Sequence, residues 1–360
     1  TKCSLLVKKR KIKMIKYFKG SIIVTIIGLI IAYFYSEHQL CGSGLKTLFI
    51  VFILSVLEIS LSFDNAVVNA VKLEHMTPKW QHRFITWGIL IAVFGMRLLF
   101  PIIIVSTFAQ VKIIETAKMA LFDINKYTYY LHQTHASILA FGGVFLMMLF
   151  LHYMFNEHKK IHWITSLEKR LSCCGQIEGL ETCICIFLIY LMQHFQPITH
   201  RLPVIISGLC GLVLYLLVHG LSEFMQNKTQ SRFEGAINTS FKAGLISFIY
   251  LELLDASFSL DGVLGAFAIS KDLIIIMIGL AIGAMFVRSL TIMLVEKQTL
   301  KQYIYLEHGA HWAIGTLALI MMISTKIEIS EIVTGLLGLI FITLAFISSL
   351  IYNKRQENNE

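Results

Sequence analysis

The chain has little charge for its length. Only 15% of its 360 residues are Asp, Glu, Lys or Arg, whereas 56% are hydrophobic and the mean hydropathy is +0.72. A soluble domain of this size needs more charge to cover its surface. The composition therefore excludes a soluble globular protein and predicts an all-α polytopic membrane protein.

Motifs of catalysis and of nucleotide binding are also lacking. The sequence has no His-Glu-x-x-His motif of a metalloprotease and no Gly-x-Ser-x-Gly nucleophile elbow. It also has few glycine-rich loops that could cradle a phosphate. We therefore expect no enzyme and no tightly bound cofactor, and any transport would be driven by an ion gradient.

Paired cysteines are lacking as well. The seven cysteines form an odd set without a regular framework, and Cys183 and Cys185 lie within one apolar run. Cysteines of this kind are usually buried thiols. We expect no disulfide and no thiolate metal site.

Basic residues are concentrated near the start of the chain. The formal net charge is +9, and residues 1–20 carry a run of lysines directly before the apolar residues 21–35. A basic segment beside a span faces anionic lipid on the cytoplasmic side, which favours the lipid bilayer over nucleic acid as a partner. A secretory signal peptide is the weaker interpretation because no small-residue cleavage site follows Tyr35.

Apolar windows of roughly 15–28 residues predict ten membrane spans. The windows are 21–35, 45–71, 84–108, 136–155, 180–196, 202–222, 243–270, 273–296, 309–325 and 331–352. They divide the chain into a basic N-terminal segment, two membrane repeats and a short tail, at 1–20, 21–196, 202–352 and 353–360.

The distribution of Lys and Arg predicts the orientation of these spans. With the N-terminus inside, 22 of the 31 Lys and Arg residues fall on the inner side and seven on the outer side. The other two, Arg97 and Arg288, lie within spans. Because positive charge marks the cytoplasmic side, we expect a bacterial inner-membrane protein with both termini in the cytoplasm.

An acidic motif occurs twice within predicted spans. The first copy reads LEISLSFDN from Leu57 to Asn65, and the second reads LDASFSLDG from Leu254 to Gly262. In register, Glu58 matches Asp255, Ser62 matches Ser259 and Asp64 matches Asp261. Acidic residues are costly inside a bilayer and usually mark a functional site.

Other features repeat in the same order. A glycine and an arginine nine residues apart follow each motif, at Gly88 and Arg97 and at Gly279 and Arg288. A His-x-x-His follows in turn, at His132 and His135 and at His308 and His311. The two motif spans are the second and the seventh, so they run in opposite directions. This order predicts the inverted repeats of a secondary transporter, with a site near the midplane.

The repeated motif predicts a site of hard oxygen ligands. Its candidate metal ligands are Glu58, Asp64, Asn65, Asp255 and Asp261. Carboxylate and amide oxygens without sulfur suit Mg²⁺, Ca²⁺ or Mn²⁺. A six-residue step turns about 240° on a continuous helix. Either Asp64 therefore faces a neighbouring helix, or the helix breaks near Ser62–Asn65 so that both acids reach one cavity.

Several further polar residues are auxiliary candidates. They are Ser62, Asn69, Ser259, Arg97, Arg288, His308 and His311. The arginines would offset the charge of the acids, or pair with them as purely structural ion pairs. The histidines are interpreted as interfacial residues with an optional role as metal ligands or proton relays. Glu252, one turn before Asp255, could also line the cavity.

The motifs resemble those of the TerC-like integral membrane proteins of bacteria. The resemblance rests on the two acidic motifs and on LEHGAH from Leu306 to His311, and it extends from about Leu45 to about Leu350. It implies membership of the LysE-type transporter superfamily, a link to tellurite resistance and, as in several members, efflux of Mn²⁺. By motif match, Glu58, Asp64 and Asp261 would handle the metal, whereas Asp255 is added from the repeat alone.

Two functions follow from these observations. The first is a secondary transporter that exports a divalent cation, Mn²⁺ being favoured over Mg²⁺ or Ca²⁺, in exchange for protons that the acids release. The second is a non-transporting membrane scaffold for envelope stress, tellurite resistance or the maturation of exported proteins. Only the first requires the buried acids to bind a cation.

Overall fold

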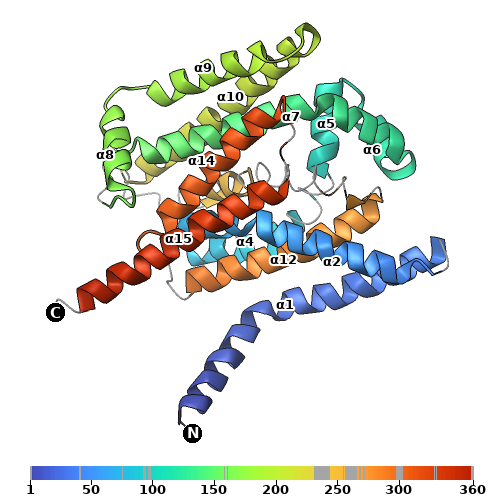
Figure 1. Ribbon diagram of the computed structural model, residues 1–360, viewed down its shortest axis with the longest axis horizontal. Coiled ribbons are helices and arrows are strands. Elements are labelled where there is room, and N and C mark those ends of the chain that lie inside the picture. Colours follow the sequence, from blue (N-terminus) through green and yellow to red (C-terminus); the bar gives the residue numbers. More distant parts are fainter. Residues whose placement is uncertain are drawn as a thin grey trace.

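The computed structural model describes most of the chain, and its described part is all-helical (Figure 1). The described residues are 2–39, 42–74, 76–91, 95, 99–157, 159, 161–230, 244–253, 255, 266, 269–270, 272–296, 303–327, 329 and 331–357. The helices are α1 (Lys2–Gln39), α2 (Gly44–Leu61), α3 (Phe63–Glu74), α4 (Pro78–Leu90), α5 (Phe100–Ala109), α6 (Ile113–Phe122), α7 (Ile124–Met154), α8 (Thr165–Cys174), α9 (Leu180–His194), α10 (Ile198–Gln230), α12 (Leu273–Glu296), α14 (Leu306–Ser324) and α15 (Glu331–Glu357). A further apolar helix covers Gly244–Leu253.

Several of these helices are long and apolar enough to cross a membrane, which confirms the multi-pass helical class. Within the described residues there are six such helices, or seven spans if the bent pair α2–α3 is included. The six are Tyr17–His38, Asn125–Met154, Ile198–Leu221, Leu273–Glu296, Leu306–Ser324 and Leu336–Gln356.

The other predicted spans differ from single long helices. Window 84–108 is shared between α4 and α5, which are 13 and 10 residues long. Window 180–196 contains α9, whose 15 residues extend only about 22 Å at 1.5 Å per residue. Window 243–270 is described mainly over Gly244–Leu253, so most of the second acidic motif lies outside the described residues.

The helix carrying the first motif breaks within the motif. The two parts, Gly44–Ser60 and Asn65–Glu74, meet at an angle of 52°. Ser62 ends α2 with φ −102° and ψ 14°, and its backbone N–H still donates to the carbonyl oxygen of Glu58. The structure therefore has the predicted break in the helix, whereas the side chain of Asp64 lies outside the described residues.

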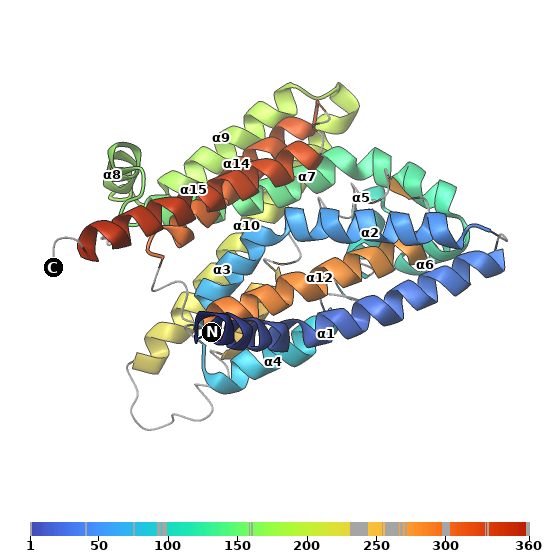
Figure 2. The same ribbon diagram turned by 60° about the horizontal axis from the view of Figure 1, so that its bottom comes forward.

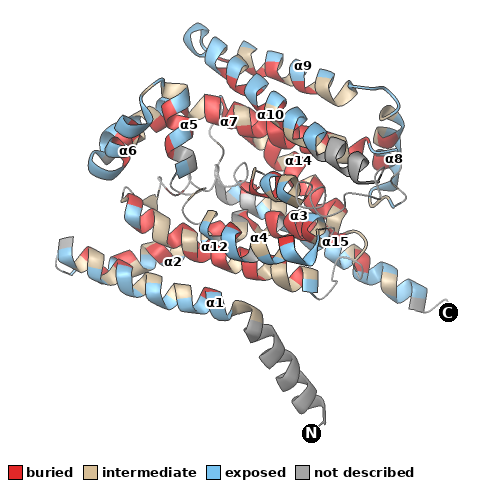
Figure 3. Ribbon diagram, turned by 180° about the vertical axis from the view of Figure 1, so that it is seen from behind, coloured by how far each residue is buried: buried red, intermediate tan, exposed pale blue. Residues whose placement is uncertain are grey.

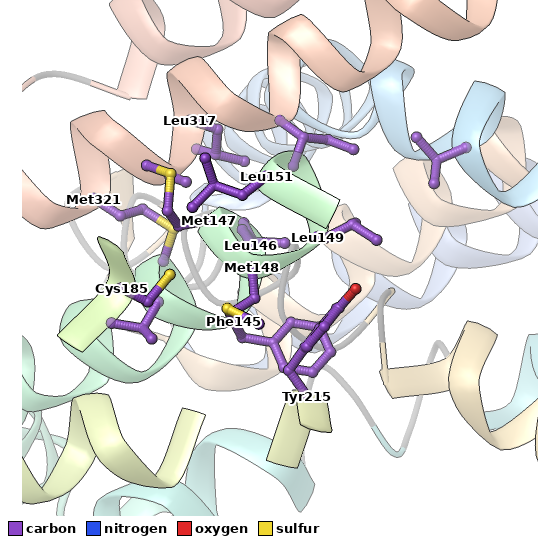
Figure 4. Close-up of a cluster of buried hydrophobic side chains, with 14 of the residues drawn as sticks. Phe145, Leu146, Met147, Met148, Leu149, Leu151, Cys185, Tyr215, Leu317 and Met321 are labelled. Carbon is purple, nitrogen blue, oxygen red and sulfur yellow. The ribbon is translucent and has the colours of Figure 1, made fainter. Parts of the chain in front are cut away.

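The core is built around α7. In its apolar window 78% of the residues are buried, against 11% in α1 at the periphery. Figure 4 shows the packing of its Phe145–Leu151 segment against α9, α10 and α14. The methionines Met147, Met148, Met321 and Met322 are all buried there, as expected for flexible side chains that fill gaps. Figure 3 shows the buried residues along the inward faces of the helices.

Helix α2 packs closely and in parallel against α12. Gly279 lies against Leu54, and Gly283 lies against the side chain of Glu58. Ser55 Oγ donates a hydrogen bond to the carbonyl oxygen of Gly279 at 3.0 Å. Glycines four residues apart allow this close approach of two helices, as in other membrane proteins.

A second parallel pair joins α4 to the helix Gly244–Leu253. Trp80 lies against Gly244, and the rings of Phe84 and Phe248 meet edge to face at 6.4 Å between centroids. One turn further along, Gly88 lies against Glu252. The contacts advance together along both helices, so the two run in the same direction.

Helices α7 and α14 form an antiparallel pair. Gly143 of α7 lies against Met322 near the end of α14, and Tyr153 at the end of α7 stacks on His311 near its start. The C-terminus and α8 lie at one end of the bundle, whereas α6 and the α1–α2 turn lie at the other (Figures 1 and 2).

Candidate functional site

A small cavity lies beside α12, where several helices meet. Its lining residues come from α3, α4, the second acidic motif and α12. They are Asn69, Phe84, Asp255, Ala284, Val287, Arg288 and Thr291. Two of the predicted acids and amides, Asp255 and Asn69, are thus brought to one cavity although they are far apart in the chain.

Arg288 is bound to Glu252 at the edge of this cavity. Its Nη2 lies 3.1 Å from Glu252 Oε1 and donates to the carbonyl oxygen of Phe84 at 3.0 Å. The guanidinium also lies over the Phe84 ring, 3.9 Å from its centroid. Gly88 leaves the space for this pair, because a Cβ there would collide with both Arg288 and Glu252. Glu252 therefore serves as the arginine's partner at the site.

Asn69, which lines the cavity, has an unsatisfied side-chain oxygen. Asn69 is 2% exposed, and its Oδ1 has no hydrogen-bond partner among the described residues. The neighbouring Asp255 is also buried. A buried polar atom without a partner is costly, so a site of this kind favours a ligand that supplies positive charge or a donor.

Glu58 of α2 lies against Gly283 of α12, next to the cavity-lining Ala284. It is 1% exposed and accepts a hydrogen bond from Ser62 Oγ at 2.9 Å. The helix break at Ser62 therefore places a hydroxyl directly on the carboxylate. Asn65, on the first turn of α3, is buried as well.

The structure describes only part of the predicted ligand set. Glu58, Asn65 and Asp255 are described and buried, whereas the side chain of Asp64 lies outside the description. Arg97, Ser259 and Asp261 also lie outside the described residues. Among the residues that are described, no group of three His, Cys, Asp or Glu side chains could hold a metal ion.

A second polar cluster, which sequence reasoning missed, surrounds Glu168 of α8. This carboxylate is fully buried and lies 2.9 Å from His308 Nδ1 and 3.1 Å from Lys159 Nζ. Trp312 Nε1 donates to it at 3.0 Å, and His162 Nδ1 lies 3.7 Å away. Because Glu168 and His308 are 140 residues apart, no local spacing could have paired them.

The charges of this cluster depend on one another. Burial by itself would raise the pKa of Glu168, but the hydrogen bonds from His308 and Trp312 and the charge of Lys159 lower it well below its ordinary value. Burial lowers the pKa of Lys159, whereas Glu168 opposes that shift. The cluster fastens the polar α7–α9 segment to the start of α14.

The histidine pairs have separate surroundings. His308 belongs to the Glu168 cluster, and His311 stacks on Tyr153 with 3.5 Å between ring centroids. Both are buried. His132, at the start of α7, is exposed. The contacts of His308 and His311 place them with Glu168 and Tyr153, outside the lining of the α12 cavity.

The close contact between Gly283 and Glu58 makes a testable prediction. A Cβ at position 283 would lie 2.5 Å from Glu58 Cβ and 2.8 Å from the Ser55 carbonyl oxygen. We expect Gly283→Ala to destabilise the protein by about 1–3 kcal/mol, because α2 and α12 must separate. Thermal unfolding of the purified protein in detergent measures this change.

Gly220→Ala is the matched control. A Cβ at Gly220 would meet nothing within 4 Å, so alanine should stabilise α10 slightly through its higher helix propensity. Equal melting temperatures for the two variants would contradict the proposed closeness of α2 and α12.

The comparisons with known proteins correct the predicted family. A family model described as "Protein of unknown function (DUF475)" matches residues 63–356. No curated protein and no solved structure matches the chain. The resemblance to TerC-like proteins was therefore wrong, because it rested on short motifs, whereas the family match extends over most of the chain. The protein belongs to the DUF475 family.

Proposed function

We propose that the protein is a secondary transporter that moves a divalent cation through the cavity beside α12. The observation that carries this proposal is that two buried polar residues line one cavity: Asp255 and Asn69, whose Oδ1 has no hydrogen-bond partner among the described residues. A cation would satisfy both groups at once. Glu58, which accepts a hydrogen bond from Ser62 and lies against Gly283 of α12, offers a further carboxylate near the cavity.

The charge balance of the site favours this function over a purely structural role for the acids. Arg288 is already paired with Glu252, which offsets its charge. Asp255 adds a second buried carboxylate to the same cavity. A buried carboxylate in that position is stabilised by a bound cation or by a proton. The alternation of cation and proton at such a site is the chemical basis of an exchanger.

The ligand atoms favour the hard cations Mg²⁺, Ca²⁺ and Mn²⁺. Carboxylate and amide oxygens bind these ions, and no thiolate lines the cavity among the described residues. The earlier preference for Mn²⁺ export came from the TerC resemblance and no longer has that support. We therefore propose a hard divalent cation as the substrate. The transport assay determines which ion is carried and in which direction.

The packing of the glycines supports the proposed inverted repeats. In the register of the two motifs Ser55 matches Glu252, and in the glycine–arginine repeat Gly88 matches Gly279. Ser55 meets Gly279 across one parallel helix pair, and Glu252 meets Gly88 across the other. Each motif helix thus packs against the glycine–arginine helix of the other half. Packing of each motif helix against the other half is expected when two related halves enclose a shared site.

The direction of the histidine helices supports the same arrangement. Helices α7 and α14 carry the equivalent His-x-x-His motifs and are antiparallel partners. His132 and His311 therefore lie toward opposite ends of the bundle. Two inverted halves would place their equivalent helices in this way.

The positions of the polar segments support the proposed orientation with both termini inside. The basic α8 segment contacts the start of α14 through Glu168 and His308, and Tyr17 hydrogen-bonds Glu296 at the end of α12. These predicted inner segments thus gather at the end of the bundle that also holds the C-terminus (Figure 2). A shared basic end is typical of the cytoplasmic face.

Flux into proteoliposomes tests the proposal. We expect the purified protein to admit at least one of Mn²⁺, Mg²⁺ and Ca²⁺ faster than protein-free liposomes, with protons moving in the opposite direction. A cation indicator and a pH indicator inside the vesicles report both movements. If a well-folded protein moves none of the three cations, the scaffold hypothesis replaces transport.

A further inference from the structure

A second, open pocket lies at the end of the bundle opposite α8, and it is rich in lysine. It lies between the end of α5, helix α6 and the start of α7, with a volume of about 480 Å³. Its lining residues are Gln110, Val111, Lys112, Glu115, Lys118, Met119, Lys126 and Tyr130. Three lysines within residues 112–126 thus surround one hollow.

The electrostatics of this pocket favour an anion. Lys112, Lys118 and Lys126 outnumber Glu115, so the lining carries a formal charge of +2. The nearby Asp123 is an N-cap of α7, where its carboxylate accepts from the Lys126 backbone N–H at 3.2 Å. The lysine ammonium groups provide donors for phosphate oxygens, whereas a neutral headgroup would leave them uncompensated.

The outer side of α6 carries exposed apolar residues around Lys118. Thr116, Met119 and Ala120 are buried against the bundle. On the other side Ile114 is 72% exposed and Phe122 is 86% exposed, and Leu121 between them is exposed as well. A short helix with lysines beside an exposed apolar side is typical of a segment that lies in the membrane interface.

We propose that this pocket binds the phosphodiester headgroup of an anionic phospholipid. The apolar side of α6 would lie among the acyl chains, and the three lysines would contact the phosphate at the level of the headgroups. Basic pockets beside membrane helices bind anionic headgroups in this way, whereas a free anion would have no use for the apolar side. The site is separate from the α12 cavity and does not depend on the proposed transport.

Lipid retention by the purified full-length protein tests this inference. The protein in detergent is mixed with phosphatidylglycerol or with phosphatidylcholine of identical acyl chains, and bound lipid is counted by native mass spectrometry. We expect preferential retention of phosphatidylglycerol, and at least about tenfold weaker binding in the triple variant Lys112→Gln, Lys118→Gln, Lys126→Gln. The three lysines are exposed, so the fold should persist.

A charge-matched variant separates a built site from general attraction. The variant Lys79→Gln, Lys169→Gln, Lys354→Gln removes three exposed lysines elsewhere on the chain and should bind phosphatidylglycerol like the wild type. Equal losses in both triple variants would overturn the inference. So would a wild-type protein that is stabilised by inorganic phosphate and gains nothing further from phosphatidylglycerol, because the pocket would then take a free anion.

Discussion

Replacement of Asp255 by asparagine is expected to reduce cation flux by at least about tenfold, with little change in the melting temperature. The substitution keeps the size of the buried side chain but removes the negative charge beside Asn69 and Arg288 in the cavity. A divalent cation then loses its charged ligand, and the site loses the group that could release a proton. Asn69→Leu should have a similar effect, because it removes the unpartnered oxygen.

Glu178→Gln is the matched control for these variants. Glu178 is an exposed carboxylate in the polar segment before α9, far from the cavity in sequence, so its loss of charge should leave flux unchanged. Initial rates in proteoliposomes with equal amounts of folded protein give the comparison. Wild-type flux in both Asp255→Asn and Asn69→Leu would remove this cavity from the transport path, whatever the cation.

Replacement of Glu168 by glutamine is expected to destabilise the protein by about 3 kcal/mol or more. The variant keeps the shape of the side chain but leaves the buried Lys159 ammonium and the His308 ring without their shared carboxylate. Removing one partner of a buried ion pair is costly because the other charge stays desolvated. Thermal unfolding in detergent should show a decrease of roughly 6 °C or more.

The same cluster predicts how stability changes with pH. The folded protein holds the pKa of Glu168 below its ordinary value of 4.5, so the folded state binds this proton less readily than the unfolded state does. The stabilisation is therefore fully present above the ordinary value and decreases as the pH falls below it. Between pH 7 and pH 4 the wild type should lose more stability than Glu168→Gln. An equal loss would show that the contacts with Lys159, His162 and His308 do not hold this carboxylate in its charged form.

The membrane class of this protein follows from its composition, because a chain with few charges and long apolar runs needs lipid around its outer surface. The broken helix at Ser62 was one of two alternatives that the sequence left open, since a six-residue spacing suits either a break or two separate faces. The structure has the break. The family could not be identified from the short motifs. A few polar residues at fixed spacing within apolar spans determine the local chemistry, but they do not specify the rest of the sequence.

The sequence by itself determined which residues are worth examining: acids, amides and arginines inside apolar spans are costly, so their presence signals a role. Only the tertiary structure decided their partners. Arg288 forms an ion pair with Glu252, Asn69 and Asp255 line the same cavity, and His308 forms a hydrogen bond with Glu168. The physical reason is that a buried charge or hydrogen-bonding group pairs with the groups that helix packing brings near it. That packing depends on close contacts between helices, such as those at Gly88 and Gly283, which no local sequence pattern encodes.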